Sequence, residues 1–557
     1  MTGGAAGIRL LAPAALLAAA RLCAQAGGFP VTVDVDASQG AGEVRPIWRF
    51  FGADEPNYAT MKDGQKLLSE LGELRPGDVY FRAHNLLNTG DGTPALKWGS
   101  TNAYTLSAGG RPVYDWTIVD RIFDSYLARG VHPYVEVGFM PEALSTHPLP
   151  YRHSWRPGLG YDSISTGWAY PPSDYARWGE LVGEWASHCA ARYGGAEVAR
   201  WYWETWNEPN LPVYWHGTPE EYYKLHDYAV AAIRRAIPGA RVGGPDVAGF
   251  GGSFMQGFLA HCAGGRNYAT GGVGTPTDFL SFHAKGSPSF VDGHVRLGIS
   301  AQLAEMDRGF RMIAASPLRD RPVVIGESDP DGCAACLGPQ LGYRTGTMYS
   351  SYTAATVARE CDLADRDHVR LEGALNWSFE FEDQPYFAGQ RVMATNGIDL
   401  PVLNVFRMFS RMAGTRIRAA SSAQAPLDEV IRDGVRGSPD VGAIASLDGR
   451  RMCVLLWHYH DDDVPGPPAL VSLRISPPGG ARGASLTEFR IDAGHANAAA
   501  RWRAMGSPQT LNDGQYAALV DSGRLKPEKA GPEIEAGAPV RVELPRQGVW
   551  LGVLDWR

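Results

Sequence analysis

The stretch that most constrains the fold of this chain is residues 201–209, with the sequence WYWETWNEP. Aromatic and β-branched residues favour a β-strand, and the proline that follows cannot continue a strand ladder. Glu208 is thereby placed at the carboxyl end of a strand, among aromatic rings. Such rings provide low-dielectric surroundings, which favour the protonated form of a carboxyl group. We expect Glu208 to act as a general acid and Asn207 to hold a substrate hydroxyl. The alternative is a turn that caps the next helix.

A second apolar run ends in the same way. Residues 322–327, with the sequence PVVIGE, are typical of a strand buried on both faces of a parallel sheet, and Glu327 ends that strand. The two glutamates are about 120 positions apart, which is room for three βα repeats when eight repeats take about 250 residues. We therefore predict an α/β fold, a (β/α)8 TIM barrel, in which they end the fourth and seventh strands.

The rest of the chain fits this alternation. The other barrel strands are expected at residues 48–52, 79–84, 132–139, 241–245, 278–283 and 371–379. Helices are expected at residues 64–74, 114–128, 173–192, 219–236, 297–315, 349–361 and 404–412. Residues 140–172 form a long loop rich in Pro, Gly, Trp and Tyr, and such a loop is usually functional. We expect it to form one wall of a binding site.

Four further side chains are predicted to line that site. Arg82 lies within a strand, where an arginine is rarely buried without a partner. It would keep a carboxylate nucleophile ionised, or it would form a purely structural ion pair, with Glu136 as one candidate partner. His84 and His283 lie at strand ends, where each would contact a substrate; the alternative for each is a locally hydrogen-bonded histidine. Trp377 also lies at a strand end and would line the site or belong to the core.

The motifs around Glu208 resemble glycoside hydrolase family 39. They are WNEPN at 206–210, Trp215, YYKL at 222–225 and VGGP at 242–245. The resemblance covers roughly residues 45 to 410 and is weaker beyond them. It implies a double-displacement reaction, with Glu327 as nucleophile and Glu208 as acid/base and with no cofactor or metal. It also implies that His283 contacts the nucleophile or a substrate hydroxyl and that Trp377 forms a platform for a sugar ring.

The resemblance also sets the expected substrate. It implies a retaining exo-glycosidase acting on pentose-containing plant-type glycans, most directly a β-xylosidase. Residues 328–332, with the sequence SDPDG, replace the aromatic residue that simple xylosidases show soon after the nucleophile. An arabinose-releasing or uronate-specific enzyme of the same family therefore stays open, as does a non-catalytic carbohydrate-binding protein.

The composition agrees with a carbohydrate partner. The chain has 557 residues with a net charge of −8, and it contains 16 Trp and 23 Tyr. The negative charge argues against nucleic acid or an anionic membrane surface as partner. Aromatic faces stack on sugar rings, although most of these residues are expected in the core. The oligomeric state is left open.

The length predicts more than one domain. Residues 1–26 resemble a signal peptide, because Arg9 precedes a short apolar run and the sequence AQA at 24–26 offers a cleavage site. We therefore expect a secreted or periplasmic protein. Residues 46–414 would form the barrel. Residues 415–557, with short strands and Gly/Pro turns, would form a β-sandwich that the strand at 27–45 joins.

The cysteines leave one question. Cys333 and Cys336 are close enough for a local bridge, and an exported protein permits disulfides. A zinc site would need a second ligand pair, and the sequence offers none at a suitable spacing. A disulfide or two free thiols are both open.

Overall fold

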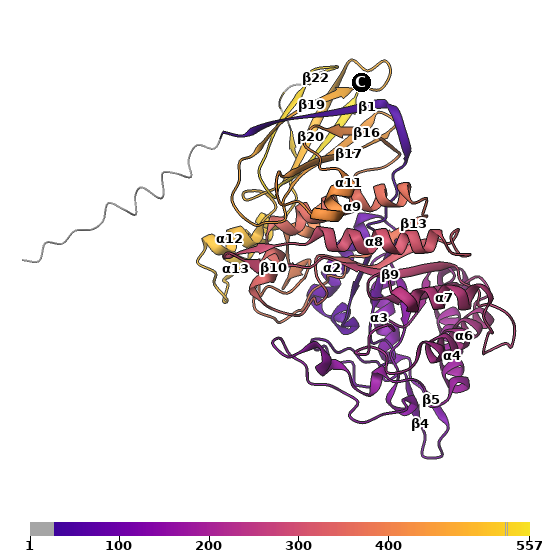
Figure 1. Ribbon diagram of the computed structural model, residues 1–557. Helices are drawn as coiled ribbons and strands as arrows, with labels where there is room; N and C mark the ends of the chain where they lie inside the picture. The colour runs from indigo at the N-terminus through magenta and orange to yellow at the C-terminus, as the bar shows by residue number, and fades with distance from the viewer. Residues whose placement is uncertain (1–26, 530, 532) are drawn as a thin grey trace, which may run out of the picture.

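The computed structural model describes residues 27–529, 531 and 533–557. It shows a barrel of strands and helices with a second sheet beside it, and the N-terminal strand lies among the C-terminal ones (Figure 1). The predicted signal peptide, residues 1–26, lies outside the described residues.

The barrel consists of eight parallel strands that are neighbours in the order of the chain. They are β2 (Phe50–Ala53), β3 (Val79–Ala83), β6 (Val131–Val137), β7 (Tyr202–Thr205), β8 (Arg241–Val247), β9 (Phe279–Lys285), β12 (Val323–Asp329) and β13 (Leu371–Ala374). Asn376 closes the ring: its N–H donates to the carbonyl of Phe50 and its carbonyl accepts from Gly52, both at 3.1 Å. The predicted TIM barrel is confirmed.

Helices, most of them amphipathic, cover the barrel. They are α2 (Lys62–Leu74), α3 (Thr117–Leu127), α4 (Tyr175–Tyr193), α6 (Pro219–Ala236), α7 (Gly252–Gly264), α8 (Ile299–Ala314), α9 (Thr347–Arg366) and α10 (Pro401–Phe409). In α4, Trp178, Leu181, Val182 and Trp185 recur at helical spacing and are buried. Thr218 caps α6, because its hydroxyl accepts from the N–H of Glu221 at 3.2 Å.

Several predicted elements have different limits, among them the eighth strand and the last barrel helix. The eighth strand ends at Ala374 rather than at residue 379, because the chain beyond it bonds both neighbouring strands in turn: the N–H of Leu375 donates to Ile325 and that of Asn376 to Phe50. Helix α10 starts at Pro401 rather than at residue 404. A proline suits the first helical position because its fixed φ matches the helix and its missing N–H would have no partner there.

The second sheet contains both ends of the described chain. Its strands are β1 (Phe29–Glu43), β16 (Thr415–Ser421), β17 (Asp440–Asp448), β18 (Arg451–Tyr459), β19 (Ala469–Ser476), β20 (Gly483–Ile491), β21 (Glu528–Lys529), β22 (Ile534–Glu535), β23 (Val540–Leu544) and β24 (Val549–Trp556). Strand β1 lies between β16, which is antiparallel to it, and β19, which is parallel. Side chains from both halves of the strand order, such as Val33 and Leu554, share one core, as in a sandwich.

The C-terminal part also contains helices that the sequence analysis did not predict. They are α11 (Leu427–Asp433), α12 (Ala498–Ala504) and α13 (Asp513–Gly523). Helices of one to three turns carry too few residues for a clear 3.6-residue period, which is why short strands dominated that prediction. In the described part of the chain, no helix combines the length and apolar character needed to cross a bilayer.

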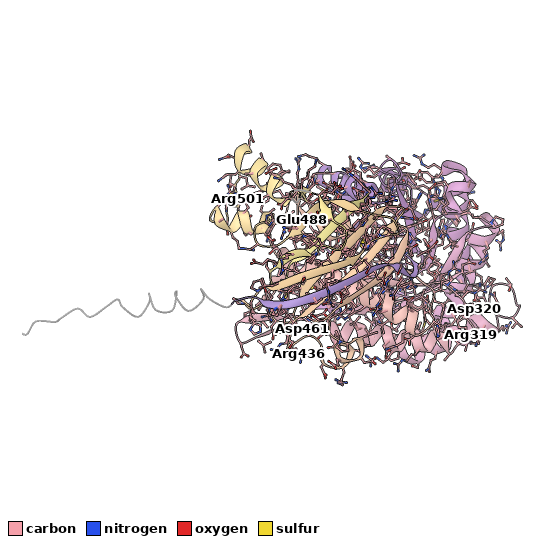
Figure 2. The ribbon with its side chains drawn as sticks, turned by 90° about the horizontal axis from the view of Figure 1, so that it is seen from above. Arg319, Asp320, Arg436, Asp461, Glu488 and Arg501 are labelled. Carbon is pink, nitrogen blue, oxygen red and sulfur yellow. A yellow bond between two sulfur atoms is a disulfide. The ribbon has the colours of Figure 1, made fainter. Side chains whose placement is uncertain are left out.

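Ion pairs join the sheet to the barrel. Arg359 of α9 reaches Asp440 of β17 at 2.9 Å, and both side chains are buried. Arg296, on the hairpin of β10 (Ser289–Val291) and β11 (His294–Arg296), reaches Asp462 at 2.5 Å. Next to it, the carbonyl of Asp461 accepts from the N–H of Leu297, while its carboxylate lies 3.9 Å from Arg436 (Figure 2). The loop after β9 is therefore held by the second domain.

Candidate active site

Glu208 and Glu327 lie at the same end of the barrel, close to one histidine. The Oε1 atom of Glu208 is 2.9 Å from Nδ1 of His283, and the Oε2 atom of Glu327 is 3.9 Å from the same nitrogen. The two oxygens therefore cannot be farther apart than the sum of these distances, about 6.8 Å. This limit is compatible with the roughly 5–5.5 Å between carboxyl groups that retaining glycosidases require.

An unusual backbone conformation aims Glu208 into the site. Trp206, Glu208 and Asp246 have φ values of 68°, 43° and 53°. These values are in the left-handed region, which residues other than glycine seldom adopt. The N–H of Glu208 donates to the carbonyl of Asp246 at 2.9 Å, and the indole of Trp206 donates to the carbonyl of Tyr214 at 3.0 Å. Such conformations persist only where neighbours hold them, and they concentrate at functional sites.

Positive charge surrounds Glu327. The ammonium of Lys285 donates to its carboxylate, and Arg82 Nη1 and His84 Nε2 each lie 3.6 Å from its Oε1 atom. Burial opposes ionisation of this carboxyl group, but Lys285, His283 and their neighbours hold its pKa well below the usual range. Glu327 is therefore ionised at neutral pH, as a nucleophile must be.

His283 connects the two carboxylates to a third acid. It is fully buried between β8 and β12, with Nε2 2.7 Å from Asp246 and Nδ1 2.9 Å from Glu208. Burial works against its protonation, but Asp246 and Glu327 outweigh burial and raise the pKa of His283 to about 10. The imidazolium donates one hydrogen bond to Asp246 and one to Glu208, so it fixes the position of the Glu208 side chain.

Arg82 lies at the centre of the acidic groups. It is fully buried and reaches Glu204 at 2.6 Å, Glu136 at 2.9 Å and also Asp246. Arg82 thus makes the contacts expected for each of its two predicted roles. It forms structural ion pairs, including the predicted one with Glu136, and it lies near Glu327. Its guanidinium also donates to Oδ1 of Asn207 at 3.1 Å.

That last contact orients Asn207. With Oδ1 taken by Arg82, the amide Nδ2 is buried and has no hydrogen-bond partner among the described residues. A buried donor without a partner is costly, so it favours a ligand that accepts from it. The amide is therefore available for a sugar hydroxyl.

His84 and Trp377 pack against each other. Their ring centroids are 4.3 Å apart, and the guanidinium of Arg82 lies 5.1 Å from the Trp377 ring. Burial lowers the pKa of His84 well below its usual value, and Nδ1 is 2.5 Å from Glu136. Trp377 is only 2 % exposed and its indole donates to Asp54 at 3.2 Å. Its ring thus has core contacts as well as a place beside the site, and the sugar platform stays a prediction.

The charged residues of this cluster that were not predicted include Lys285, Asp329, Asp246 and Glu204. The ammonium of Lys285 reaches Asp329 at 2.6 Å in addition to Glu327. Side chains two positions apart on a strand point to the same side, so His283 predicts the orientation of Lys285, and Glu327 that of Asp329. Asp246 directly follows the VGGP motif at the end of a strand. These signals were present in the sequence.

The long loop at 140–172 reaches the site through Tyr161. The Tyr161 hydroxyl is hydrogen-bonded to the hydroxyl of Tyr214, and its ring lies 5.4 Å from the ammonium of Lys97. Glu380 and Glu382 follow the eighth barrel strand, where the sequence suggests that they line the pocket, but they accept from the backbone N–H groups of Gly397 and Asp63 at 2.8 Å each. These two carboxylates support the barrel beside α2.

Outside this cluster, the two groups to consider are a cysteine pair and a possible metal site. Cys333 and Cys336 form a disulfide with Cα atoms 5.4 Å apart, in the loop after β12. Across residues 27–529, 531 and 533–557, no three His, Cys, Asp or Glu side chains are arranged to hold a metal ion. The cluster instead offers what general acid–base and nucleophilic catalysis need: an ionised carboxylate, a second carboxyl group beside a charged histidine, and an amide donor.

Known proteins share this architecture. The family model described as glycosyl hydrolases family 39 matches residues 31–542. A β-xylosidase of Geobacillus stearothermophilus is 33% identical over 395 residues, 67% of this chain and 70% of that protein. An α-L-iduronidase of Canis lupus familiaris is 29% identical over 342 residues, 58% of this chain and 45% of that protein.

A solved structure agrees in fold. The crystal structure of a monomeric β-xylosidase from Caulobacter crescentus CB15 superposes with a TM-score of 0.71 at 23% identity, covering 94% of this chain and 99% of that one. The family model spans both the barrel and the second sheet, and the chain belongs to the glycosyl hydrolases of family 39.

Proposed function

We propose that this chain is an exported, retaining exo-β-xylosidase with Glu327 as nucleophile and Glu208 as acid/base. The observation that carries the proposal is the shared contact of both carboxylates with His283, which limits their separation to about 6.8 Å. Relatives named β-xylosidase support a xylose-containing substrate. The charges around Glu327 support its role, because a carboxylate nucleophile must stay ionised through the pH range of the reaction.

The reaction has two displacements. In the first, a Glu327 oxygen bonds to the anomeric carbon while the bond to the leaving oxygen breaks, and that oxygen takes the proton of Glu208. In the second, Glu208 removes a proton from water, the water oxygen bonds to the anomeric carbon, and Glu327 leaves. Two inversions restore the starting configuration. Asn207 donates to the sugar hydroxyl next to the anomeric carbon, an interaction that strengthens in the transition state.

Azide separates the two roles. With an activated glycoside, Glu208→Ala still forms the glycosyl-enzyme, and azide then replaces water to give a β-glycosyl azide. Glu327→Gly has no nucleophile, so azide cannot restore turnover with retained stereochemistry. NMR of the products distinguishes these outcomes. Retained product from Glu327→Gly with azide would refute the assignment.

A uronate-specific enzyme is the second candidate, and Lys285 favours it. This lysine is a partly exposed cation in contact with Glu327 and Asp329, so it supplies a positive group near the sugar. The relative named α-L-iduronidase points the same way. A panel of nitrophenyl β-D-xyloside, α-L-arabinoside and α-L-iduronide decides between these substrates, and no turnover of any would favour a binding protein.

Export is proposed from residues 1–26. Expression of the full chain with its native N-terminus, followed by N-terminal sequencing of the extracellular or periplasmic product, tests it. A mature protein that begins at Gly27 supports cleavage after Ala26. Retention of the intact chain inside the cell would contradict it.

A further inference from the structure

A second charged cluster is connected to Glu327 through His84, which approaches Oε1 of that carboxylate while His283 approaches Oε2. Asp54 and Glu55 directly follow β2, and Lys97 belongs to the loop after β3. The ammonium of Lys97 donates to Asp54, and all three residues are buried. Neither the nucleophile nor the acid/base contacts these groups directly, so the reaction steps above do not use them.

The two acids hold Lys97 in a specific conformation. Its φ of 58° is in the left-handed region, which a lysine seldom adopts. The carboxylate of Glu55 accepts from the backbone N–H of Lys97, while Asp54 accepts from its side chain. Backbone and ammonium are thus each fixed by one of two consecutive acids. A strained residue that its neighbours hold so fully is a feature of ligand-binding sites.

A short series of contacts connects this cluster to the nucleophile. Asp54 Oδ1 lies 3.4 Å from Nε2 of His84, and the same nitrogen lies 3.6 Å from Oε1 of Glu327. Neither distance is that of a strong hydrogen bond, so the polar atoms of His84 and Asp54 can separate to admit a hydroxyl. Through His84 and Asp54, the series connects Glu327 to Lys97.

The position of these contacts in the barrel indicates which part of a bound sugar lies next to Asp54 and Lys97. In the proposed reaction the anomeric carbon lies between Glu208 and Glu327, which His283 of β9 connects. Strands β2 and β3 lie across the barrel from β9 in the strand order. A sugar ring whose anomeric carbon lies near Glu327 therefore points its opposite end toward Asp54 and Lys97. The hydroxyls at that end are the ones far from the anomeric carbon.

We propose that Lys97 and Asp54 are specificity residues that bind a hydroxyl at the non-reducing end of the sugar, an inference that rests on the proposed glycosidase function. An ammonium has three donors, and Asp54 takes one of them, so Lys97 donates to the hydroxyl oxygen while Asp54 accepts the hydroxyl proton. A hydroxyl enclosed in this way cannot carry a further sugar. The pair therefore restricts the enzyme to terminal residues, which is exo action.

Deoxy substrates test this proposal. The glycoside that the wild type cleaves fastest in the panel is compared with its 3-deoxy and 4-deoxy analogues, using the wild type and the double variant Asp54→Asn/Lys97→Met. The double variant removes the charges of Asp54 and Lys97 together, and Glu55 keeps its hydrogen bond from the backbone N–H of residue 97. We expect the wild-type kcat/KM to fall at least about tenfold on one analogue, the value for one hydrogen bond to a charged group. In the double variant the two substrates should differ less than about threefold.

The control is Lys224→Met. Lys224 is on α6, with its ammonium 4.2 Å from the Tyr175 ring, and it should keep the full wild-type discrimination. If the double variant does not fold, Asp54→Asn alone preserves the shape and should show a partial loss of discrimination. A purely structural ion pair would slow the parent and deoxy substrates equally.

The outcomes separate the two proposals. Equal discrimination in wild type and double variant overturns the role of Lys97 and Asp54 and leaves the glycosidase proposal intact. Wild-type discrimination below about twofold on both analogues does the same. Absence of any turnover by the wild type overturns the proposed function, and the inference that rests on it, before any variant is compared.

Discussion

Removal of the Lys285 ammonium should change the pH dependence of the enzyme more than its maximal rate. Lys285 donates to the Glu327 carboxylate and to Asp329, and it heads the groups that hold the pKa of Glu327 below its usual range. An adjacent opposite charge typically lowers a carboxyl pKa by about 1–3 units. Lys285→Met should therefore raise the pKa of Glu327 by about that amount, equivalent to roughly 1.4–4 kcal/mol.

The sign follows from the charge of the nucleophile. Glu327 reacts as a carboxylate, so activity is lost as pH falls through its pKa in the folded enzyme. A higher pKa moves the acidic limb of the kcat/KM profile to higher pH, while the rate on the plateau changes less. Arg82 and His283 still lie near Glu327 in the variant, which limits the shift. Asp329 keeps a cation as well, because Arg391 lies 3.4 Å from it.

The assay is kcat/KM for one activated glycoside between about pH 3 and 9, with Lys285→Arg and Lys224→Met as controls. Lys285→Arg keeps the charge and should keep the acidic limb near its wild-type position. Lys224→Met removes a distant lysine and should change nothing. If the acidic limb of Lys285→Met coincides with that of the wild type, the lysine does not control ionisation of Glu327 and the electrostatic argument is wrong.

Other predictions concern stability. His283 has a pKa of about 10 in the folded protein and about 6.5 when unfolded, so its contribution to stability is complete below pH 6.5 and is lost as pH rises toward 10. Over that range the wild type should lose stability faster than His283→Asn, by up to about 1.4 kcal/mol per pH unit in urea titrations. Parallel curves of stability against pH would contradict this. Arg82→Met should cost about 3–5 kcal/mol because it leaves Glu204, Glu136 and Asp246 without their shared cation. As a control, Arg241→Met removes a cation that stacks on Tyr202 and donates to the Tyr80 hydroxyl at 3.3 Å, and it should cost about 2 kcal/mol or less; equal losses in thermal unfolding would refute the comparison. Replacing both Cys333 and Cys336 by Ala should cost about 2 kcal/mol or less in denaturant, because the bridge closes a loop with a sequence separation of only 3; a much larger loss would mean that the loop carries long-range stability.

The barrel could be predicted because each strand is a short apolar run and most helices are long enough to show their period. The convergence of Glu208 and Glu327 could be predicted because each follows a strand of a parallel barrel, and the carboxyl ends of such strands lie at the same end of the barrel. Lys285 was within reach through the two-residue period of β9. Glu136 was predicted as a partner of Arg82, but Glu204 and Asp246 were not, because they come from two further strands that only the closed barrel brings next to Arg82.

The contact between Asp54 and Lys97 shows a second limit of sequence reasoning. These residues are separated by a strand, a helix and a loop, and the lysine adopts a left-handed conformation that its residue type does not favour. No local pattern indicates such a conformation. Helices α12 and α13 were missed for a different reason, since they are short and lie between strands of the second sheet.

The position of strand β1 in the second sheet limits the order in which this enzyme can fold. It is made first, yet both of its neighbours, β16 and β19, come from the last third of the chain. On the ribosome its backbone N–H and C=O groups have no sheet to join until those strands emerge, well after the barrel sequence is complete. A chain cut after Met412 would leave Val31, Val33 and Val35 on a strand with two open edges, which is a template for aggregation. The second domain thus protects the beginning of the chain, and shortened versions of this enzyme should be made without β1 as well.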